Sequence, residues 1–111
     1  MQVFFRSKKL QKQCNSDREM QKAFGTARTR KLQQRLMELG AADNLSQIAR
    51  VPPPRCHELT GDRKGQITVD LDHPYRLVFL PANDPIPTKE DGGLDWDLVT
   101  EIEILEITDP H

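Results

Sequence analysis

The sequence predicts an α+β domain in which an N-terminal strand and helices pack on one face of a mostly antiparallel β-sheet. Two changes of pattern support this fold class. Residues 2–5 read as a short strand, and apolar side chains then recur at three- and four-residue steps as far as residue 39, as on an amphipathic helix. From residue 66 the period becomes two, which is typical of strands with one buried face. A chain of 111 residues suits a single domain, 1–111, with one core.

Two helices are expected between residues 7 and 40. The first covers about residues 7–13, and the second begins at Ser16, because Ser16 and Glu19 match the capping-box pattern. Gly40 is expected to end the second helix, and Gly25 inside it is expected to cost roughly 1 kcal/mol relative to alanine. The apolar stripe of this helix comprises Met20, Ala23, Phe24, Ala27, Leu32, Leu36 and Leu39.

A hairpin is expected after a short third helix. Residues 44–49 form that helix, which the prolines at 52–54 end. Strands at residues 66–71 and 75–80 follow, and Asp72-His73-Pro74 is the tight turn that joins them.

A final strand covers residues 99–108, and we expect it at the centre of the sheet because its end is apolar on both faces. The apolar residues divide into Ile102 and Ile104 on one face and Leu105 and Ile107 on the other. Between the last two strands, residues 81–97 form a long loop, and loops of this length are usually functional or mobile. Trp96 is expected to pin this loop to the body.

Charge is distributed unevenly although the net charge is only −1. Residues 1–64 carry a balance of +8, and residues 65–111 carry −9. The basic half could form a phosphate-binding face. Alternatively, the two halves pair with each other in the fold.

A cytoplasmic protein without a membrane partner is expected. No apolar run approaches the roughly 20 residues that span a bilayer, and the run at residues 2–5 is shorter than the core of a signal peptide. Cys14 and Cys56 are therefore expected to be thiols and not a disulfide.

Histidines and cations are the main candidates for chemistry. His57, His73 and His111 lack the spacing of a metal site, so we expect neither metal nor cofactor. The turn at residues 61–65 lacks the phosphate-loop pattern. His73, in a His-Pro turn, is expected to be structural.

Cleavage of an RNA phosphodiester needs three groups and no metal. A base takes the 2′-hydroxyl proton, a cation stabilises the pentacovalent phosphorus, and an acid protonates the leaving 5′-oxygen. Histidine titrates near neutrality, and the arginine fork binds phosphate oxygens in pairs. His57, Arg76 and His111 supply these groups if the sheet brings them together.

Each of these three residues also has a structural alternative. Arg76, within a hairpin strand, could form a salt bridge across the sheet to one of the C-terminal acids. His57 could be a surface or capping histidine. His111 is the terminal residue, and terminal residues are often disordered.

The ordered set of motifs resembles the HigB branch of the RelE-like toxins, the ribosome-dependent mRNA endonucleases of bacterial type II toxin–antitoxin pairs. The resemblance spans essentially the whole chain. Its motifs are Phe-Arg-Ser-Lys at 5–8, the long basic helix, the segment 56–65, Pro-Tyr-Arg-Leu-Val-Phe at 74–79, and the Ile-Leu-Glu-Ile strand ending in Asp-x-His. It implies a twisted antiparallel sheet that cradles mRNA on the ribosome, and a cognate antitoxin that is often a helix-turn-helix protein.

The resemblance also implies roles for individual residues. His57 and His111 would transfer protons or position the reacting hydroxyl, Arg76 would stabilise the phosphorane, and Asp109 would orient His111 or contact the substrate. Further RNA contacts are expected from Arg63 and Lys64 on the backbone phosphate, and from Lys8, Lys9, Lys12, Arg28 and Arg35 on ribosomal RNA.

The chain departs from the family at two of these positions. Pro110 stands where the family usually has tyrosine, and Thr60 replaces a lysine common before Gly61. Loss of the tyrosine removes an aromatic ring that could stack on a base. The alternative function is therefore a catalytically attenuated module of the same fold that binds RNA or the antitoxin.

Overall fold

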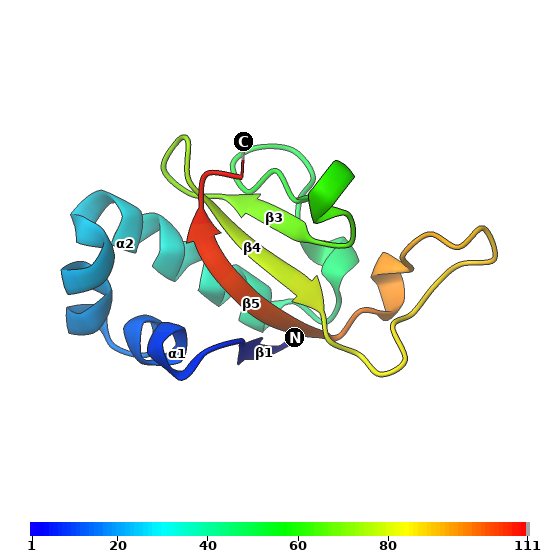
Figure 1. Ribbon diagram of the computed structural model, residues 1–111, viewed down its shortest axis with the longest axis horizontal. Helices are drawn as coiled ribbons and strands as arrows, with labels where there is room; N and C mark the ends of the chain where they lie inside the picture. Colours follow the sequence, from blue (N-terminus) through cyan, green and yellow to red (C-terminus); the bar gives the residue numbers. More distant parts are fainter. Residues whose placement is uncertain (111) are drawn as a thin grey trace.

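The computed structural model describes residues 1–110, and its centre is a five-stranded sheet with the strand order β1-β5-β4-β3-β2. The strands are β1 (Gln2–Phe5), β2 (His57–Glu58), β3 (Ile67–Asp70), β4 (Arg76–Pro81) and β5 (Glu101–Thr108). Strand β1 pairs with β5 in parallel, and the other pairs are antiparallel. The second half of the long helix α2 crosses behind the sheet in Figure 1, and no helix covers the front. The α+β prediction is confirmed.

The central position predicted for the last strand is also confirmed, because β5 lies between β1 and β4. Its face pattern differs from the prediction. Leu77 pairs with Ile107 and Val78 with Glu106, but the next residue, Phe79, pairs with Ile104, so Leu105 is an extra residue in β5. This β-bulge resets the alternation, and Ile107 packs against the core on the same face as Ile104. The expectation that Ile107 faces away from Ile104 was wrong.

Helices α1 (Lys8–Cys14) and α2 (Asp17–Ala41) begin where the sequence predicted. The Ser16 hydroxyl accepts a hydrogen bond from the Glu19 amide at 3.3 Å, as in a capping box. Gly40 does not end α2, which continues to Ala41. The Met1 amino group instead donates to the carbonyls of Leu39 and Gly40 at 3.1 and 3.0 Å. A cation at this end satisfies free carbonyls and suits the helix dipole.

Gly25 divides α2 into two helical parts. Its φ of 77° and ψ of 173° are not helical, so the backbone kinks there. The expectation that Gly25 destabilises the helix relative to alanine was wrong, because this backbone conformation is nearly exclusive to glycine. The kink also interrupts the apolar stripe: Met20, Leu32 and Leu39 are buried, whereas Ala23 and Ala27 are exposed.

Two segments outside the main strands differ from the prediction, one with less regular structure than expected and one with more. The third helix is only a single 3-10 turn, η1 (Leu45–Gln47), capped by the Asn44 side chain. The loop at 81–97 forms a hairpin through a β-bridge between Thr88 and Leu94, followed by η3 (Trp96–Leu98).

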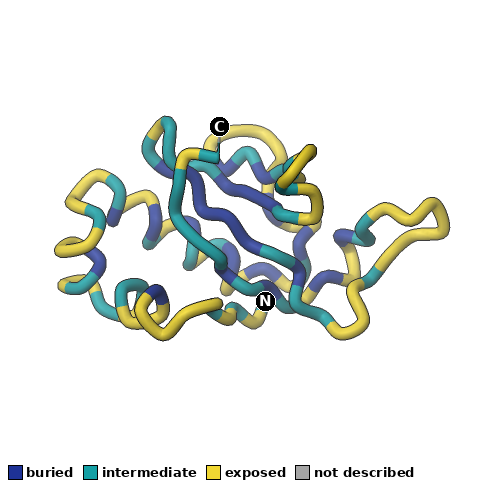
Figure 2. The backbone as a smooth tube through the Cα atoms, in the orientation of Figure 1, coloured by how far each residue is buried: buried dark blue, intermediate teal, exposed yellow. Residues whose placement is uncertain are grey.

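The hairpin projects from the body in Figure 1, and Figure 2 shows that most of it is exposed while the middle of the sheet is buried. Trp96 pins its base, as predicted. The side chain of Trp96 is buried, Trp96 Nε1 donates to Glu58 Oε2 at 3.2 Å, and the Arg50 guanidinium stacks 3.8 Å from the ring centroid. Among residues 1–110, no helix is long and apolar enough to cross a membrane.

Candidate functional site

Three of the residues predicted to bind or cleave RNA meet at one cavity of about 470 Å³, on the face of the sheet away from α2. We call it the histidine–arginine cavity. It is lined by His57, Glu58, Leu59, Thr60, Asp62, Arg63, Arg76 and Pro110. The pairing register of β2, β3 and β4 explains why His57 and Arg76 reach the same cavity. His57 lies opposite Thr68, Thr68 lies opposite Val78, and Arg76 is two residues from Val78 on the same face of β4.

The ring of His57 has a defined orientation. Its Nδ1 lies 2.9 Å from the backbone carbonyl oxygen of Arg55. A carbonyl oxygen only accepts hydrogen bonds, so in the neutral ring Nδ1 carries the proton and Nε2 is the basic nitrogen. The backbone therefore fixes the tautomer that a general base requires.

Arg76 is mostly buried, at 9% exposed. Its Nε lies 3.6 Å from Oδ1 of Asp70, its register partner on β3. A cross-sheet ion pair of Arg76, the structural alternative, is thus present with Asp70 on the neighbouring strand.

The Asp70 carboxylate contacts both Arg55 and Arg76, and this role was not predicted from the sequence. Arg55 Nε and Nη2 donate to Asp70 Oδ2 and Oδ1 at 2.7 and 3.0 Å. This hydrogen bonding raises the pKa of the Arg55 guanidinium. Asp70 therefore links Arg55, whose carbonyl orients His57, to Arg76. Asp70 lies beside Arg76 only because of the pairing register of β3 and β4, which no local pattern predicts.

Arg35 was wrongly expected to contact ribosomal RNA. It is 1% exposed, its Nε donates to the backbone carbonyl of Asp70 at 2.8 Å, and its Nη1 donates to Glu38 at 2.9 Å. In this position it ties α2 to β3 and offers no donor to an external phosphate. A signal for this was present, because Arg35 lies three residues after Leu32 and four before Leu39, on the buried stripe.

Arg28 and Arg63 are also engaged within the protein. Arg28 Nε donates to Asp72 at 3.1 Å, and its guanidinium stacks 3.5 Å from the Tyr75 ring centroid. Arg63 Nη1 donates to Gln66 Oε1 at 2.9 Å and lies 3.5 Å from Glu106. A phosphate would replace part of these contacts at either residue. Pairing between the basic and acidic halves, one of the two alternatives for the charge asymmetry, therefore does occur.

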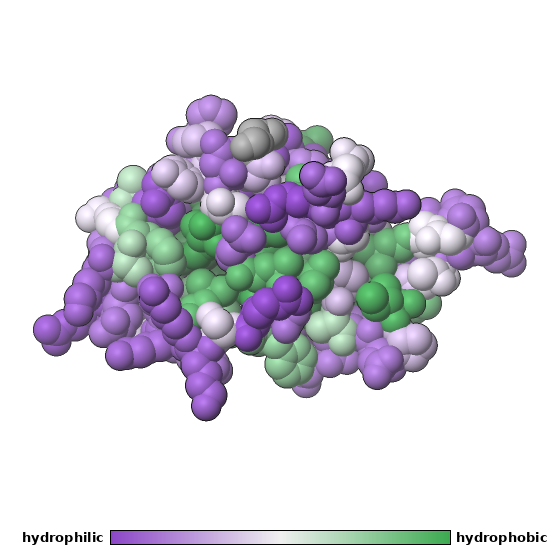
Figure 3. Space-filling view, in the orientation of Figure 1, coloured by the Kyte–Doolittle hydropathy of each residue, from purple (hydrophilic) through white to green (hydrophobic). Residues whose placement is uncertain are grey.

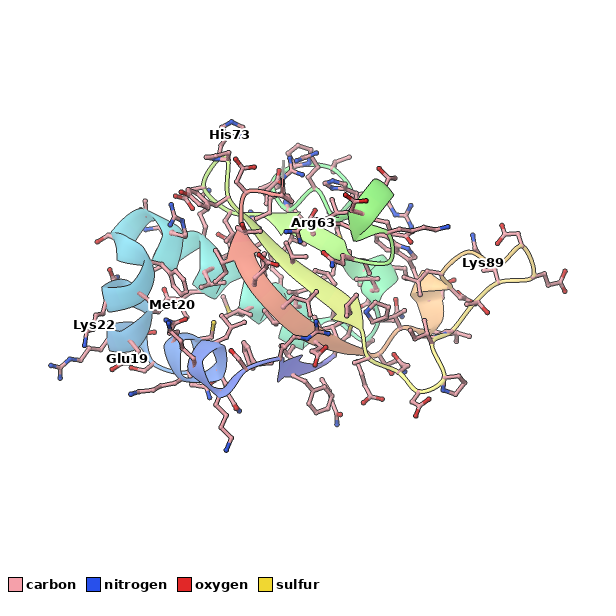
Figure 4. All side chains as sticks on the ribbon, viewed as in Figure 1. Glu19, Met20, Lys22, Arg63, His73 and Lys89 are labelled. Carbon is pink, nitrogen blue, oxygen red and sulfur yellow. The ribbon has the colours of Figure 1, made fainter. Side chains whose placement is uncertain are left out.

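The remaining predicted cations are exposed and lie apart from the site, except for Lys64. Lys8, Lys9 and Lys12, hereafter the α1 lysines, are exposed on α1, which lies at the lower left of Figure 1. None of them lines the histidine–arginine cavity. Figure 4 shows Lys22 on that same side of the molecule, with Arg63 over the sheet. Lys64 is exposed beside Arg63. The structure thus separates one cationic surface from the cavity.

The chain terminus reaches the cavity through Pro110, the position at which the resembled family has tyrosine. Asp109 is exposed just after β5. His111, one of the predicted proton-transfer residues, lies outside the described residues. His73 is exposed at the tip of the β3–β4 turn (Figure 4), and it does not line the histidine–arginine cavity.

Cys14 and Cys56 are free thiols, as predicted. Burial raises the pKa of Cys14 to about 11 and that of Cys56 to about 12, so both are protonated at neutral pH and neither is a nucleophile. Within residues 1–110, no group of three or more histidine, cysteine or acidic side chains is arranged to hold a metal ion.

No protein-family model matches the chain, and a search of curated proteins finds no match.

Proposed function

We propose that this protein is an mRNA endonuclease toxin of the HigB type, which cleaves mRNA on the ribosome. In line with the resemblance, a cognate antitoxin of the helix-turn-helix class neutralises it. The single observation that supports the proposal best is the convergence of His57, Arg63 and Arg76 on one cavity. These residue types match the base and the cations that phosphodiester cleavage requires.

The proposed reaction starts with transfer of the 2′-hydroxyl proton to Nε2 of His57. The 2′-oxygen attacks phosphorus, the bond to the 5′-oxygen breaks, and a 2′,3′-cyclic phosphate and a 5′-hydroxyl result. Arg76 stabilises the charge on the pentacovalent phosphorus, and Arg63 and Lys64 hold backbone phosphate. His111 protonates the leaving oxygen, and Asp109 orients His111. This scheme assigns every proton and charge to a side chain and needs no cofactor.

A second candidate function is a binding module with attenuated catalysis. Pro110 favours it, because this residue lines the histidine–arginine cavity where the resembled family has an aromatic ring. Proline also fixes its own backbone φ angle, which restricts how the terminus approaches a substrate.

The test is cleavage of a defined mRNA on programmed ribosomes, in a Mg²⁺ buffer that keeps the ribosome intact. Wild type, Pro110→Tyr and Arg76→Ala are compared with Arg18→Ala, an exposed arginine of α2, as the control. Cleavage by wild type and by the control, but not by Arg76→Ala, supports the endonuclease. Cleavage only by Pro110→Tyr supports the attenuated module. Silence of both wild type and Pro110→Tyr, or full activity of Arg76→Ala, refutes the catalytic assignment.

A further inference from the structure

A second cavity, of about 780 Å³, adjoins the histidine–arginine cavity. The two cavities share Glu58, Leu59 and Thr60 as a common wall. The rest of the second cavity is lined by Gly61, Lys64, Gly65, Leu80, Pro81, Ile86, Thr88, Gly92, Gly93 and Leu94. We call it the hairpin cavity, because the 81–97 hairpin supplies one side of it. Its volume lies in the range of about 300–1,000 Å³ that is usual for ligand sites.

The two cavities differ in chemistry. The first contains His57, Arg63 and Arg76, whereas aliphatic side chains dominate the second. Figure 3 shows hydrophobic residues gathered over the sheet and at the root of the hairpin, with hydrophilic residues around them. Arg63 lines the histidine–arginine cavity, and the next residue, Lys64, lines the hairpin cavity. Two adjacent cations therefore lie near the junction of the two cavities.

The wall formed by the hairpin is held in place. The Thr88–Leu94 bridge closes the hairpin, and the bond from Trp96 to Glu58 fastens its base to β2, at the wall shared by both cavities. Glu58, Thr60 and Thr88 add hydrogen-bonding groups to the apolar surroundings.

We propose that the hairpin cavity binds a base of the RNA strand whose phosphate lies in the histidine–arginine cavity. This inference depends on the proposed function and adds a subsite to it. A single strand presents alternating charged phosphates and apolar base faces, and proteins bind it with cationic grooves beside apolar platforms. The two adjoining cavities have that alternation. An apolar segment of a protein partner would fit the aliphatic wall equally well, but the cations at the junction favour a polyanion.

The test uses Ile86→Ser, with Leu98→Ser as the matched control. Both residues belong to the 81–98 region and are largely exposed, at 52% and 59%, but only Ile86 lines the hairpin cavity. Binding is measured by fluorescence anisotropy with short adenosine and uridine oligonucleotides. All riboses are 2′-O-methylated to prevent cleavage, and single abasic sites are placed at each position in turn.

One abasic position is expected to weaken binding to wild type and to Leu98→Ser by a few-fold, which is less than for a base stacked on an aromatic ring because the cavity wall is aliphatic. Ile86→Ser is expected to bind the intact oligonucleotide a few-fold more weakly and to show a much smaller penalty at that abasic position. An identical abasic profile for Ile86→Ser and wild type overturns the base subsite alone. Failure of wild type to bind any of the oligonucleotides overturns the subsite, while the ribosome cleavage assay judges the proposed function separately. Unchanged RNA binding together with loss of a protein partner by Ile86→Ser assigns the cavity to that partner and also overturns the subsite.

Discussion

Replacing Asp70 tests whether one carboxylate organises the candidate site. Asp70→Asn removes the charge that Arg55 binds through two hydrogen bonds and that lies 3.6 Å from Arg76. The Arg55 side chain is 38% exposed, so its pair contributes on the scale of a surface ion pair, about 0.2–1 kcal/mol. The Arg76 side chain is only 11% exposed, so removal of the charge next to it should lower the unfolding free energy by more than loss of the Arg55 pair. We expect a decrease of about 1–2 kcal/mol in the free energy of unfolding.

Asp72→Asn is the matched control. The Asp72 and Asp70 side chains are both 28% exposed, and Asp72 also accepts two bonds from one arginine, Arg28, but it does not reach Arg76. We expect Asp72→Asn to lower the unfolding free energy by about 0.2–1 kcal/mol. Calorimetry distinguishes the two variants, because 1 kcal/mol corresponds to about 4 °C in Tm for a domain of this size.

The same pair of variants separates stability from function. Misplacement of Arg76 is expected to reduce ribosome-dependent cleavage by Asp70→Asn at least about tenfold at a temperature where the protein is folded, with cleavage by Asp72→Asn unchanged. Equal losses of Tm in the two variants, or wild-type stability of Asp70→Asn, would refute the reasoning about the shared carboxylate.

Three further predictions follow from the structure. Gly25→Ala is expected to destabilise the fold by about 1–3 kcal/mol because of the positive φ at this position. Gly40 lies in regular helix, and a Cβ added there would meet nothing within 4 Å, so Gly40→Ala is expected to stabilise the fold by up to about 1 kcal/mol; urea denaturation measures both changes. Burial raises the pKa of Cys56 from 9.0 to about 12, so as the pH rises the thiol ionises in the unfolded state before it ionises in the folded state. Cys56 should therefore lower the unfolding free energy above about pH 9, by up to about 1.4 kcal/mol per pH unit, and Cys56→Ala should show a smaller fall. Replacing the α1 lysines by glutamine should weaken ribosome association and reduce its salt dependence, and an unchanged salt slope would exclude them from the contact.

Local patterns predicted the elements of this fold well. Ser16 and Glu19 located the start of α2, and alternation located the β3–β4 hairpin, because caps and strand periodicity depend on residues close in sequence. The kink at Gly25 and the bulge at Leu105 were missed. The kink and the bulge each change which of the following residues face the core, and neither follows from the local sequence pattern.

The candidate site was predictable only in part, for the same reason. Residue chemistry identified His57 and Arg76, and the sheet register brings them to one cavity. Asp70 was not among the predicted site residues, because only the strand register places it opposite Arg76. Arg35 could have been assigned to the interior from its helical spacing, but a long, charged side chain is usually exposed, and the prediction followed that tendency.

The two kinds of cation are used differently, which has a consequence for how the proposed toxin would meet its substrate. Arginines of the basic half bind acids of the other half, as in the pairs of Arg28 with Asp72 and Arg55 with Asp70. The planar guanidinium suits such paired bonds, whereas the strongly hydrated lysine ammonium stays in solvent. The α1 lysines are therefore left for an external polyanion, and none of them lines the histidine–arginine cavity. Under the proposed function, the lysines would contact ribosomal RNA while the cavity holds the scissile phosphate, so affinity for the ribosome and the rate of chemistry should be separable by mutation.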